Sequence, residues 1–280
     1  MTDTRERELA LQAQTIRITG LKMVQNSRSG HIGGAFSMAE LMAVLYFDKM
    51  HLRPEQPDWP ERDRFVLSKG HCTVALYPTL ALRGFFPVER LSEFRKLDGQ
   101  LSGHAEMRHV PGVDMSTGSL GQGFSAALGM AMAAKLAGLP STVYAVMGDG
   151  EIQEGQFWEA CLYAGAHGVD NLIGIVDSNK VQLDGRISEV LDTGDLEAKF
   201  KDFGFFVQSI DGHDVRAVSE ALDRAKAEPG RPGMIVANTV KGKGVSFMEN
   251  TNKWHGRVPN DAEFAAAFAE LYRRKAELEG

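Results

Sequence analysis

Polar side chains follow two apolar runs of the chain, at points where a metal ion could bind. The first run, Val143–Met147, ends in Gly148-Asp149-Gly150, and the second run, Leu172–Val176, ends in Asp177-Ser178-Asn179. Short apolar runs bounded by turn residues are typical of strands that are buried on both faces. Because parallel strands present their carboxyl ends at one edge of a sheet, we expect the Asp149 carboxylate and the Asn179 amide to lie together. Two hard oxygen donors favour Mg²⁺ or Ca²⁺ over zinc.

Two segments place glycines where a phosphate group could approach the backbone. Gly148 and Gly150 flank the aspartate and allow a sharp turn, although Gly-Asp-Gly also occurs in ordinary surface turns. The segment Met115–Gly123 carries three glycines before a predicted helix of small residues, Phe124–Ala137. Its composition resembles a phosphate-binding turn, yet it lacks the Gly-Lys-Ser/Thr of Walker A and the strand spacing of a dinucleotide fingerprint. The small-residue helix predicts close helix packing, either within the chain or between subunits.

Four of the eight histidines stand beside glycines in predicted loops: His31, His71, His104 and His255. His71 follows a predicted strand and precedes a predicted helix, which is a favourable place for phosphate. One loop histidine is most often an ordinary surface residue, but four of them near a predicted metal site indicate a functional cluster. Imidazole can donate, accept and shuttle protons near neutral pH. The other four histidines are predicted to be ordinary surface or structural residues: His51, His109, His167 and His213.

The elements that must position these side chains alternate between helices and strands. The apolar spacing predicts helices at 5–26, 38–49, 73–83, 91–97, 124–137, 154–166, 195–203, 214–228 and 261–277, and strands at 64–68, 143–147, 172–176, 205–209 and 234–238. Ser37 and Glu40 have the spacing of a capping box for the helix at 38–49. The alternation indicates an α/β fold, a doubly wound parallel sheet with helices on both faces. Because no linker or repeat interrupts it, we expect one domain over residues 1–280.

Composition argues against several classes of function. The net charge is −6 without a basic block, which argues against nucleic acid as the main partner. The apolar stretches are too short to span a bilayer and the N-terminus has no apolar signal core, so we expect a cytoplasmic protein without a membrane partner. Cys72 and Cys161 are too few for a disulfide framework and lack metal-ligand spacing. We therefore expect both cysteines to be buried.

Taken together, these residues resemble the N-terminal, diphosphate-binding part of transketolases, which are thiamine diphosphate enzymes. The resemblance runs over nearly the whole chain. Its motifs stand in the order of that family: SGHIGG (29–34), DRFVLSKGH (63–71), GHAE (103–106), PGVDMSTGSLGQG (111–123), GDGEIQEG (148–155), DSNKVQLDG (177–185) and WHG (254–256). Ile32 and Ser119 stand where transketolases commonly have proline. These two changes bear on the choice of sugar more than on the type of reaction.

The resemblance implies a metal–diphosphate site. Asp149, the side chain of Asn179 and the carbonyl of Val181 would hold Mg²⁺ (or Ca²⁺), and the metal would clamp the diphosphate of thiamine diphosphate. His71 and His255 would hydrogen-bond the diphosphate or lie against the substrate. The other implied cofactor contacts are Gly118, Ser119 and Leu120 beneath the pyrimidine, and Gly148 and Gly150 close to the diphosphate.

The resemblance also implies roles at the substrate end. His31, His104 and His255 would face the hydroxyls and the carbonyl of the sugar, where they can shuttle protons and stabilise developing oxyanions. Glu154 matches a glutamate that lies near the dimer interface, in a carboxylate network that links two cofactors. The implied reaction moves a two-carbon ketol unit from a ketose phosphate to an aldose phosphate.

Transketolases carry, downstream of this domain, a second domain whose glutamate activates the aminopyrimidine. Since the sequence stops at Gly280, we expect a split enzyme in which a separate C-terminal subunit supplies that pyrimidine-binding domain, as an α₂β₂ assembly. Alternatives are 1-deoxyxylulose-phosphate synthase, a 2-oxo acid dehydrogenase α subunit, and a split enzyme for a specialised ketose such as a sulfosugar or branched sugar. A non-catalytic paralogue and a Rossmann-type nucleotide binder are further alternatives from other classes.

Overall fold

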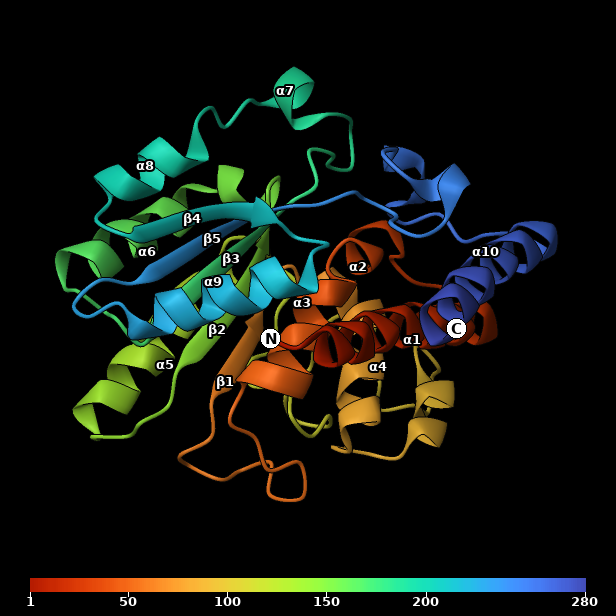
Figure 1. The fold of residues 1–280 in the computed structure, drawn as a ribbon, viewed down its shortest axis with the longest axis horizontal. Helices are drawn as coiled ribbons and strands as arrows, with labels where there is room; N and C mark the ends of the chain where they lie inside the picture. Colours follow the sequence, from red (N-terminus) through yellow and green to blue (C-terminus); the bar gives the residue numbers. More distant parts are fainter.

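The computed structural model describes residues 1–280, and its centre is one parallel sheet (Figure 1). The strand order is β1-β2-β3-β5-β4, and all neighbouring pairs are parallel. The strands are β1 (Arg64–Leu67), β2 (Val143–Gly148), β3 (Leu172–Ser178), β4 (Phe206–Asp211) and β5 (Gly233–Asn238). In the register of β2 and β3, Gly148 is opposite Asp177. This register brings Asp149 and Asn179 to the same edge, as the strand-end pattern predicts.

Helices cover both faces of the sheet, which confirms the predicted fold class (Figure 1). Alternate residues of β2 belong to two different cores: Tyr144 and Val146 to one, and Val143, Ala145 and Met147 to the other. Helices with buried residues in the first core are α1 (Asp3–Ser27), α3 (Ala39–Val44), α4 (Thr73–Arg83), α9 (Val215–Ala227) and α10 (Asp261–Glu279). Those in the second core are α5 (Gln122–Leu136), α6 (Gly155–Ala166) and α8 (Leu196–Asp202).

Helix α1 has the apolar stripe that its spacing predicts, with Leu9, Ile16, Leu21 and Val24 fully buried. It packs against α3, α4 and α10 rather than mainly against the sheet, so this side of the molecule has a second helical layer. Burying one such aliphatic side chain contributes about 1.5–3 kcal/mol. Two further single-turn helices, α2 (Gly33–Phe36) and α7 (Ile187–Val190), lie in loops that the sequence pattern leaves irregular.

The predicted helix at 38–49 is only partly correct. Helix α3 begins at Ala39, and from Leu45 to Lys49 the chain forms a π-helical turn. The predicted capping box does not form, because both of its side chains have buried partners elsewhere. Ser37 donates to the carboxylate of Asp177, and Glu40 binds Arg17. A buried ion pair competes successfully with a cap that is worth about 1 kcal/mol.

The short helix predicted at 91–97 is wrong in its position. The structure has a 3₁₀ segment at Val88–Glu93 instead, and Leu97 is 99% exposed. Cys72 and Cys161 are buried and free, as predicted. None of the helices combines the length and the apolar composition needed to cross a bilayer.

Candidate functional site

A cavity of about 430 Å³ opens at the carboxyl edge of β2 and β3. It collects residues from seven separate motifs of the sequence. Of the thirteen predicted site residues, twelve line it: His31, His71, His104, Gly118, Leu120, Gly148, Asp149, Gly150, Glu154, Asn179, Val181 and His255. The thirteenth, Ser119, lines a separate hollow of about 330 Å³, which shares Gly118 with the cavity. The structure therefore brings the predicted residues together around one space.

The predicted metal ligands come from two strand ends: Asp149 follows β2, and Asn179 and Val181 lie in a tight turn after β3. Asp149 is 3% exposed and accepts hydrogen bonds from the backbone N–H groups of Gly150, at 3.0 Å, and Lys180. Lys180 adopts φ +66°, which turns the chain so that Val181 N–H donates to Asn179 Oδ1 at 3.1 Å. Burial and the nearby Asp177 raise the pKa of Asp149 to about 6. An ionised carboxylate at this depth favours a cation beside it.

The donor set fits a hard divalent cation. The three predicted ligands offer carboxylate, amide and carbonyl oxygens, which Mg²⁺ and Ca²⁺ prefer. No group of three or more His, Cys, Asp or Glu side chains is arranged to hold a metal, so the chain offers no typical zinc cage. The cavity wall also contains the buried Oε1 of Gln182, which has no hydrogen-bond partner. Such an atom fits a site that is completed by a bound polar group.

Two buried lysines that the residue pattern did not single out supply positive charge to the cavity. The ammonium of Lys69 donates to Asp177 and, at 2.8 Å, to the carbonyl of Gly34. The ammonium of Lys241 donates to the carbonyl of Val181 at 2.7 Å and lies 3.0 Å from Nδ1 of His255. Burial lowers the pKa of Lys241 to about 8. Both cations line the cavity and suit an anionic ligand such as a diphosphate.

Asp177 supports the site from behind. It is fully buried and accepts hydrogen bonds from Ser37, Thr239 and Lys69. Burial opposes its ionisation, but the Lys69 ammonium and the two hydroxyls outweigh that effect and lower the pKa of Asp177. Asp177 also accepts a 3.2 Å bond from Nδ2 of Asn179. This bond fixes the amide so that its oxygen is the atom left for a metal.

The four loop histidines pack against one another at the cavity wall. The ring centroid of His31 lies 5.2 Å from that of His71, 5.7 Å from that of His255 and 6.1 Å from that of His104. Burial, followed by neighbouring positive charge, lowers the pKa of His31 and His71 to about 4 and that of His255 to about 3. The pKa of His104 is lowered for the same reasons. The cluster is therefore neutral at pH 7 and acts through hydrogen bonds.

A buried glutamate that the residue pattern does not single out joins three of the motifs. Glu151 accepts hydrogen bonds from the hydroxyl of Ser68 and from the N–H groups of Gly121, at 3.1 Å, and Gly148, at 3.0 Å. Burial raises the pKa of Glu151 despite these donors. Gly121 has φ +79° and lies where a side chain would meet Glu154. Glu151 thus holds the glycine turn against the ends of β1 and β2.

His213 has a supporting contact with the loop after β5. Its Nδ1 lies 2.9 Å from Oε2 of Glu40, and its Nε2 accepts the N–H of Val240 at 2.8 Å. Glu40 in turn forms a bidentate pair with Arg17, with both N–O distances 2.6 Å. The structural role predicted for this histidine is therefore specific: it anchors the segment that carries Lys241. His51, His109 and His167 are exposed.

Comparison with known proteins decides the family of this chain. A family model described as the thiamine diphosphate binding domain of transketolase matches residues 9–273. The chain belongs to the transketolase family. It is 46% identical to 6-deoxy-6-sulfo-D-fructose transketolase subunit SqwG of Clostridium sp. (strain MSTE9), over 96% of this chain and 98% of the relative. It is 37% identical to one of the subunits of apulose-4-phosphate transketolase from Phocaeicola vulgatus, over 97% of this chain and 96% of the relative.

Solved transketolases have the same fold. The transketolase from Leishmania mexicana superimposes with a TM-score of 0.86 at 32% identity, over 97% of this chain and 45% of that chain. The Pichia stipitis transketolase in complex with sedoheptulose-7-phosphate gives a TM-score of 0.87 at 32% identity, over 97% and 44%. This transketolase-family chain therefore spans less than half the length of those two proteins. The shared part is the domain that binds thiamine diphosphate.

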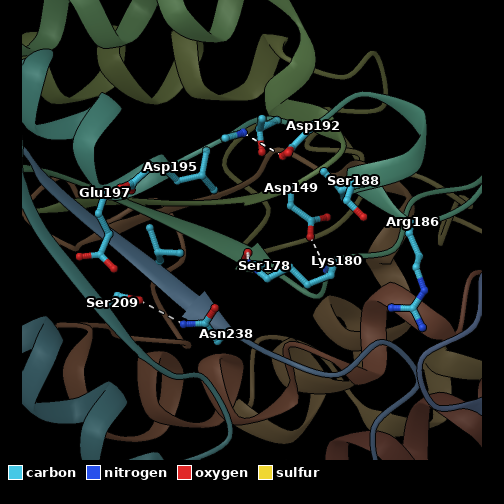
Figure 2. Close-up of a pocket in the computed structure, with 15 residues that line it drawn as sticks. Asp149, Ser178, Lys180, Arg186, Ser188, Asp192, Asp195, Glu197, Ser209 and Asn238 are labelled. Carbon is cyan, nitrogen blue, oxygen red and sulfur yellow. Dashed lines mark hydrogen bonds between the residues drawn. The ribbon is translucent and has the colours of Figure 1, made fainter.

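A second hollow of about 440 Å³ adjoins the first cavity and shares only Asp149 with it (Figure 2). Two of its acidic side chains make hydrogen bonds within their own loop. Asp192 accepts from Gly194 N–H at 2.9 Å, and Asp195 accepts from Ala198 N–H at 3.0 Å as the N-cap of α8. These two carboxylates are therefore engaged in turn and cap hydrogen bonds.

Proposed function

We propose that this chain is the diphosphate-binding subunit of a split transketolase, folded as a single domain over residues 1–280. It moves a two-carbon ketol unit from a ketose to an aldose with thiamine diphosphate and Mg²⁺ (or Ca²⁺). The observation that carries the proposal is the meeting of Asp149, Asn179, Val181 and the histidine cluster around one cavity. A relative that matches this chain over 98% of its own length bears the name of a transketolase subunit, which supports the split arrangement.

The chain holds the diphosphate end of the cofactor. Asp149, Asn179 and the carbonyl of Val181 bind the metal, and Lys69 and Lys241 add positive charge to the same wall. Burial lowers the pKa of Lys241, and a bound anion would favour the charged form of this ammonium. His71 and His255, whose rings stack 5.1 Å apart, lie beside these cations. Gly148 and Gly150 let the diphosphate approach the backbone.

Three of the histidines bind the sugar substrate through hydrogen bonds. Thiamine diphosphate, when bound, supplies the electron sink for cleavage of the carbon–carbon bond of a ketose. His31, His104 and His255 hold the hydroxyls and carbonyl of the sugar with neutral imidazole groups. Their low pKa values keep them uncharged at pH 7, so that each carries one N–H donor and one nitrogen acceptor. A neutral ring can therefore donate a hydrogen bond to a sugar oxygen, or accept one from a sugar hydroxyl where its free nitrogen faces the sugar.

The surface beside the cavity is suited to partner chains. Ser119 and Leu120, on the turn beneath the predicted pyrimidine position, are exposed, and so is Glu154. We assign this open side to a second subunit that carries the pyrimidine-binding domain. The nearby helices α5 and α6 pack against each other and expose three large apolar side chains: Leu136 at 87%, Leu162 at 61% and Tyr163 at 42%. Contact between two copies through these helices completes an α₂β₂ assembly.

Reconstitution tests the partner requirement. The purified chain alone is expected to lack transketolase activity, and addition of the partner subunit is expected to restore it. Full activity of the pure chain would contradict the split arrangement. Within the assembly, Leu162→Arg is expected to weaken the contact between copies in sedimentation velocity, whereas Lys201→Met on α8 leaves it unchanged.

Metal and cofactor binding have a separate test. In the reconstituted complex, Asp149→Ala is expected to abolish Mg²⁺-dependent binding of thiamine diphosphate measured by calorimetry. Asp192→Ala, in the second hollow, is the matched control because its carboxylate serves only its own loop. Unchanged cofactor binding by Asp149→Ala would refute the metal assignment.

The relatives favour a specialised ketose as donor. The chain is 46% identical to the subunit named for 6-deoxy-6-sulfo-D-fructose, against 37% for the subunit named for apulose-4-phosphate. We therefore propose a ketose with a terminal anionic group, with 6-deoxy-6-sulfo-D-fructose as the first candidate and phosphorylated ketoses as the second. A panel of ketoses, assayed by the aldehyde released, decides between them. A higher kcat/KM for phosphorylated ketoses would make the sulfosugar the wrong choice.

A further inference from the structure

Arg95 reaches the histidine cluster from the loop that precedes His104. Its backbone has φ +54°, a left-handed conformation that is uncommon for arginine, and its N–H donates to the carbonyl of Leu101 at 2.8 Å. The guanidinium donates to the hydroxyl of Ser29 at 2.9 Å, and its second terminal nitrogen lies 3.3 Å from Nδ1 of His31. The local turn thus points a half-buried cation at one nitrogen of a predicted catalytic ring.

Gly103 leaves the space that the guanidinium of Arg95 occupies. A Cβ placed on Gly103 would lie 2.3 Å from the guanidinium, so any larger residue there would displace Arg95. The partners of the guanidinium are neutral: a hydroxyl, an imidazole nitrogen and, at 3.5 Å, the carbonyl of Gly103. Its Nε is buried without a partner. No carboxylate binds this cation, so no counter-ion offsets its charge beside the His31 ring.

The contact determines where His31 carries its proton. A guanidinium has five N–H donors and no acceptor, so the His31 nitrogen that faces it must offer a lone pair. Nδ1 is therefore unprotonated, and the neutral ring carries its hydrogen on Nε2. The charged or titratable groups that face His31 are His71, Arg95, His104, Lys241 and His255. None of them is an anion that would favour a doubly protonated ring.

The protonated nitrogen is free for a ligand. The hydrogen bond that His31 makes within the chain is at Nδ1. Its Nε2 lies where a Cβ on Gly256 would approach to 3.7 Å, so the glycine of the WHG motif leaves that edge of the ring uncovered. The ring lines the cofactor cavity. Substrate oxygens that enter the cavity can therefore meet an N–H group at this position.

We infer that Arg95 is a positioning residue that locks His31 in the tautomer with hydrogen on Nε2, so that His31 donates a hydrogen bond to a sugar oxygen and does not accept a proton from it. This role rests on the proposed transketolase function, but the tautomer itself can be measured without substrate. Removal of the guanidinium releases Nδ1 and allows the ring to exchange tautomers or take up a second proton.

Nitrogen NMR of the full chain, labelled with ¹⁵N-histidine, tests the tautomer directly. His31→Asn assigns the ring signals. In the unmodified chain at pH 7, Nδ1 of His31 is expected to show the signal of an unprotonated ring nitrogen and Nε2 that of a protonated one. In Arg95→Met the two signals are expected to move toward each other. A protonated Nδ1 in the unmodified chain, or unchanged His31 signals in Arg95→Met, overturns the inference.

Two further variants separate this role from a general loss of structure. Arg90→Met removes an arginine from the same loop region, where it binds Glu93 and Gln100, and is expected to leave the His31 signals unchanged. Arg95→Lys keeps a cation that donates and is expected to retain the wild-type tautomer. A shift of equal size in Arg90→Met would also overturn the inference, because it would mean that the loop rather than the guanidinium controls the ring.

Kinetics in the reconstituted complex test the effect of the contact between Arg95 and His31 on catalysis. Arg95→Met is expected to lower kcat by at least about tenfold, with a smaller change in KM, because a donor to developing charge is misplaced. Its kcat is also expected to fall on acidification at a higher pH than in the unmodified complex, in which the pKa of His31 is about 4. Equal kcat and pH profile for the two complexes would refute the positioning role. Inactivity of both complexes toward every ketose tested would reject the proposed function and leave the NMR result to decide the tautomer.

Discussion

The buried pair of Lys69 and Asp177 gives the sharpest test of how the site is held together. The Lys69 side chain is 3% exposed and the Asp177 side chain is fully buried. Lys69→Met leaves a buried carboxylate that only neutral donors stabilise. Asp177→Asn leaves a buried ammonium whose remaining partner is the carbonyl of Gly34. Each single substitution therefore leaves one buried charge without its counter-ion.

The cost follows from that uncompensated charge. Removing one partner of a buried ion pair typically costs about 3–5 kcal/mol of the free energy of unfolding. For a chain of 280 residues, this loss lowers the midpoint of thermal unfolding by about 5–8 °C. The double variant Lys69→Met/Asp177→Asn has no unpaired charge. Ser37 and Thr239 donate to different oxygens of Asp177, so the single amide oxygen keeps one of these two hydrogen bonds. The loss in the double variant is expected to be smaller than the sum of the two single losses by about 1–3 kcal/mol.

Urea unfolding of the four proteins at pH 7, followed by circular dichroism, measures this coupling. Lys201→Met is the matched control, since Lys201 is 59% exposed and lies 3.8 Å from Glu197. It is expected to change stability by less than about 1 kcal/mol. If the double variant loses as much free energy of unfolding as the two single variants together, the two side chains are not coupled and the reasoning fails. The same holds if each single variant loses as little as the control.

Two further predictions concern packing and pH. Gly70→Ala is expected to cost about 1–3 kcal/mol in urea unfolding, because a Cβ there would lie 2.5 Å from the backbone of Thr117. Gly129→Ala, on an exposed stretch of α5 with nothing within 4 Å of the new carbon, is expected to gain about 0.5–1 kcal/mol. A loss of equal size in both variants would mean that the clash is not the cause. Burial lowers the pKa of His71 to about 4 in the folded chain. In the unfolded chain His71 has its ordinary pKa of about 6.5, so its imidazole binds a proton more readily there. The thermal midpoint is therefore expected to rise from pH 4 to pH 6.5, less steeply in His71→Asn than in the unmodified chain. Parallel slopes for the two proteins would show that His71 does not contribute.

Much of the fold was predictable because its signals are local. Four of the five strands contain an apolar run between turn residues, and they alternate with predicted helices, so the alternation of the elements indicates the parallel sheet. The carboxyl ends of such strands must share one edge, which is why Asp149 and Asn179 could be placed together from spacing alone. The errors at 38–49 and 91–97 arise where tertiary contacts override local propensity. Ser37 and Glu40 have buried partners elsewhere, so they do not cap the helix. Leu97 is exposed, so no apolar contact supports a helix there.

Asp149 and Asn179 can be found as candidate metal ligands without coordinates, because that information lies in residue type and in position after a strand. The other candidate ligands of the metal and the diphosphate follow from the family resemblance. Which charges neutralise one another depends instead on the folded molecule. Lys69 and Asp177 are 108 residues apart, and Arg95 and His31 are 64 apart, so no periodicity links them. Their partnership depends on the packing of whole elements, and it sets the charge of the cavity and the tautomer of its ring.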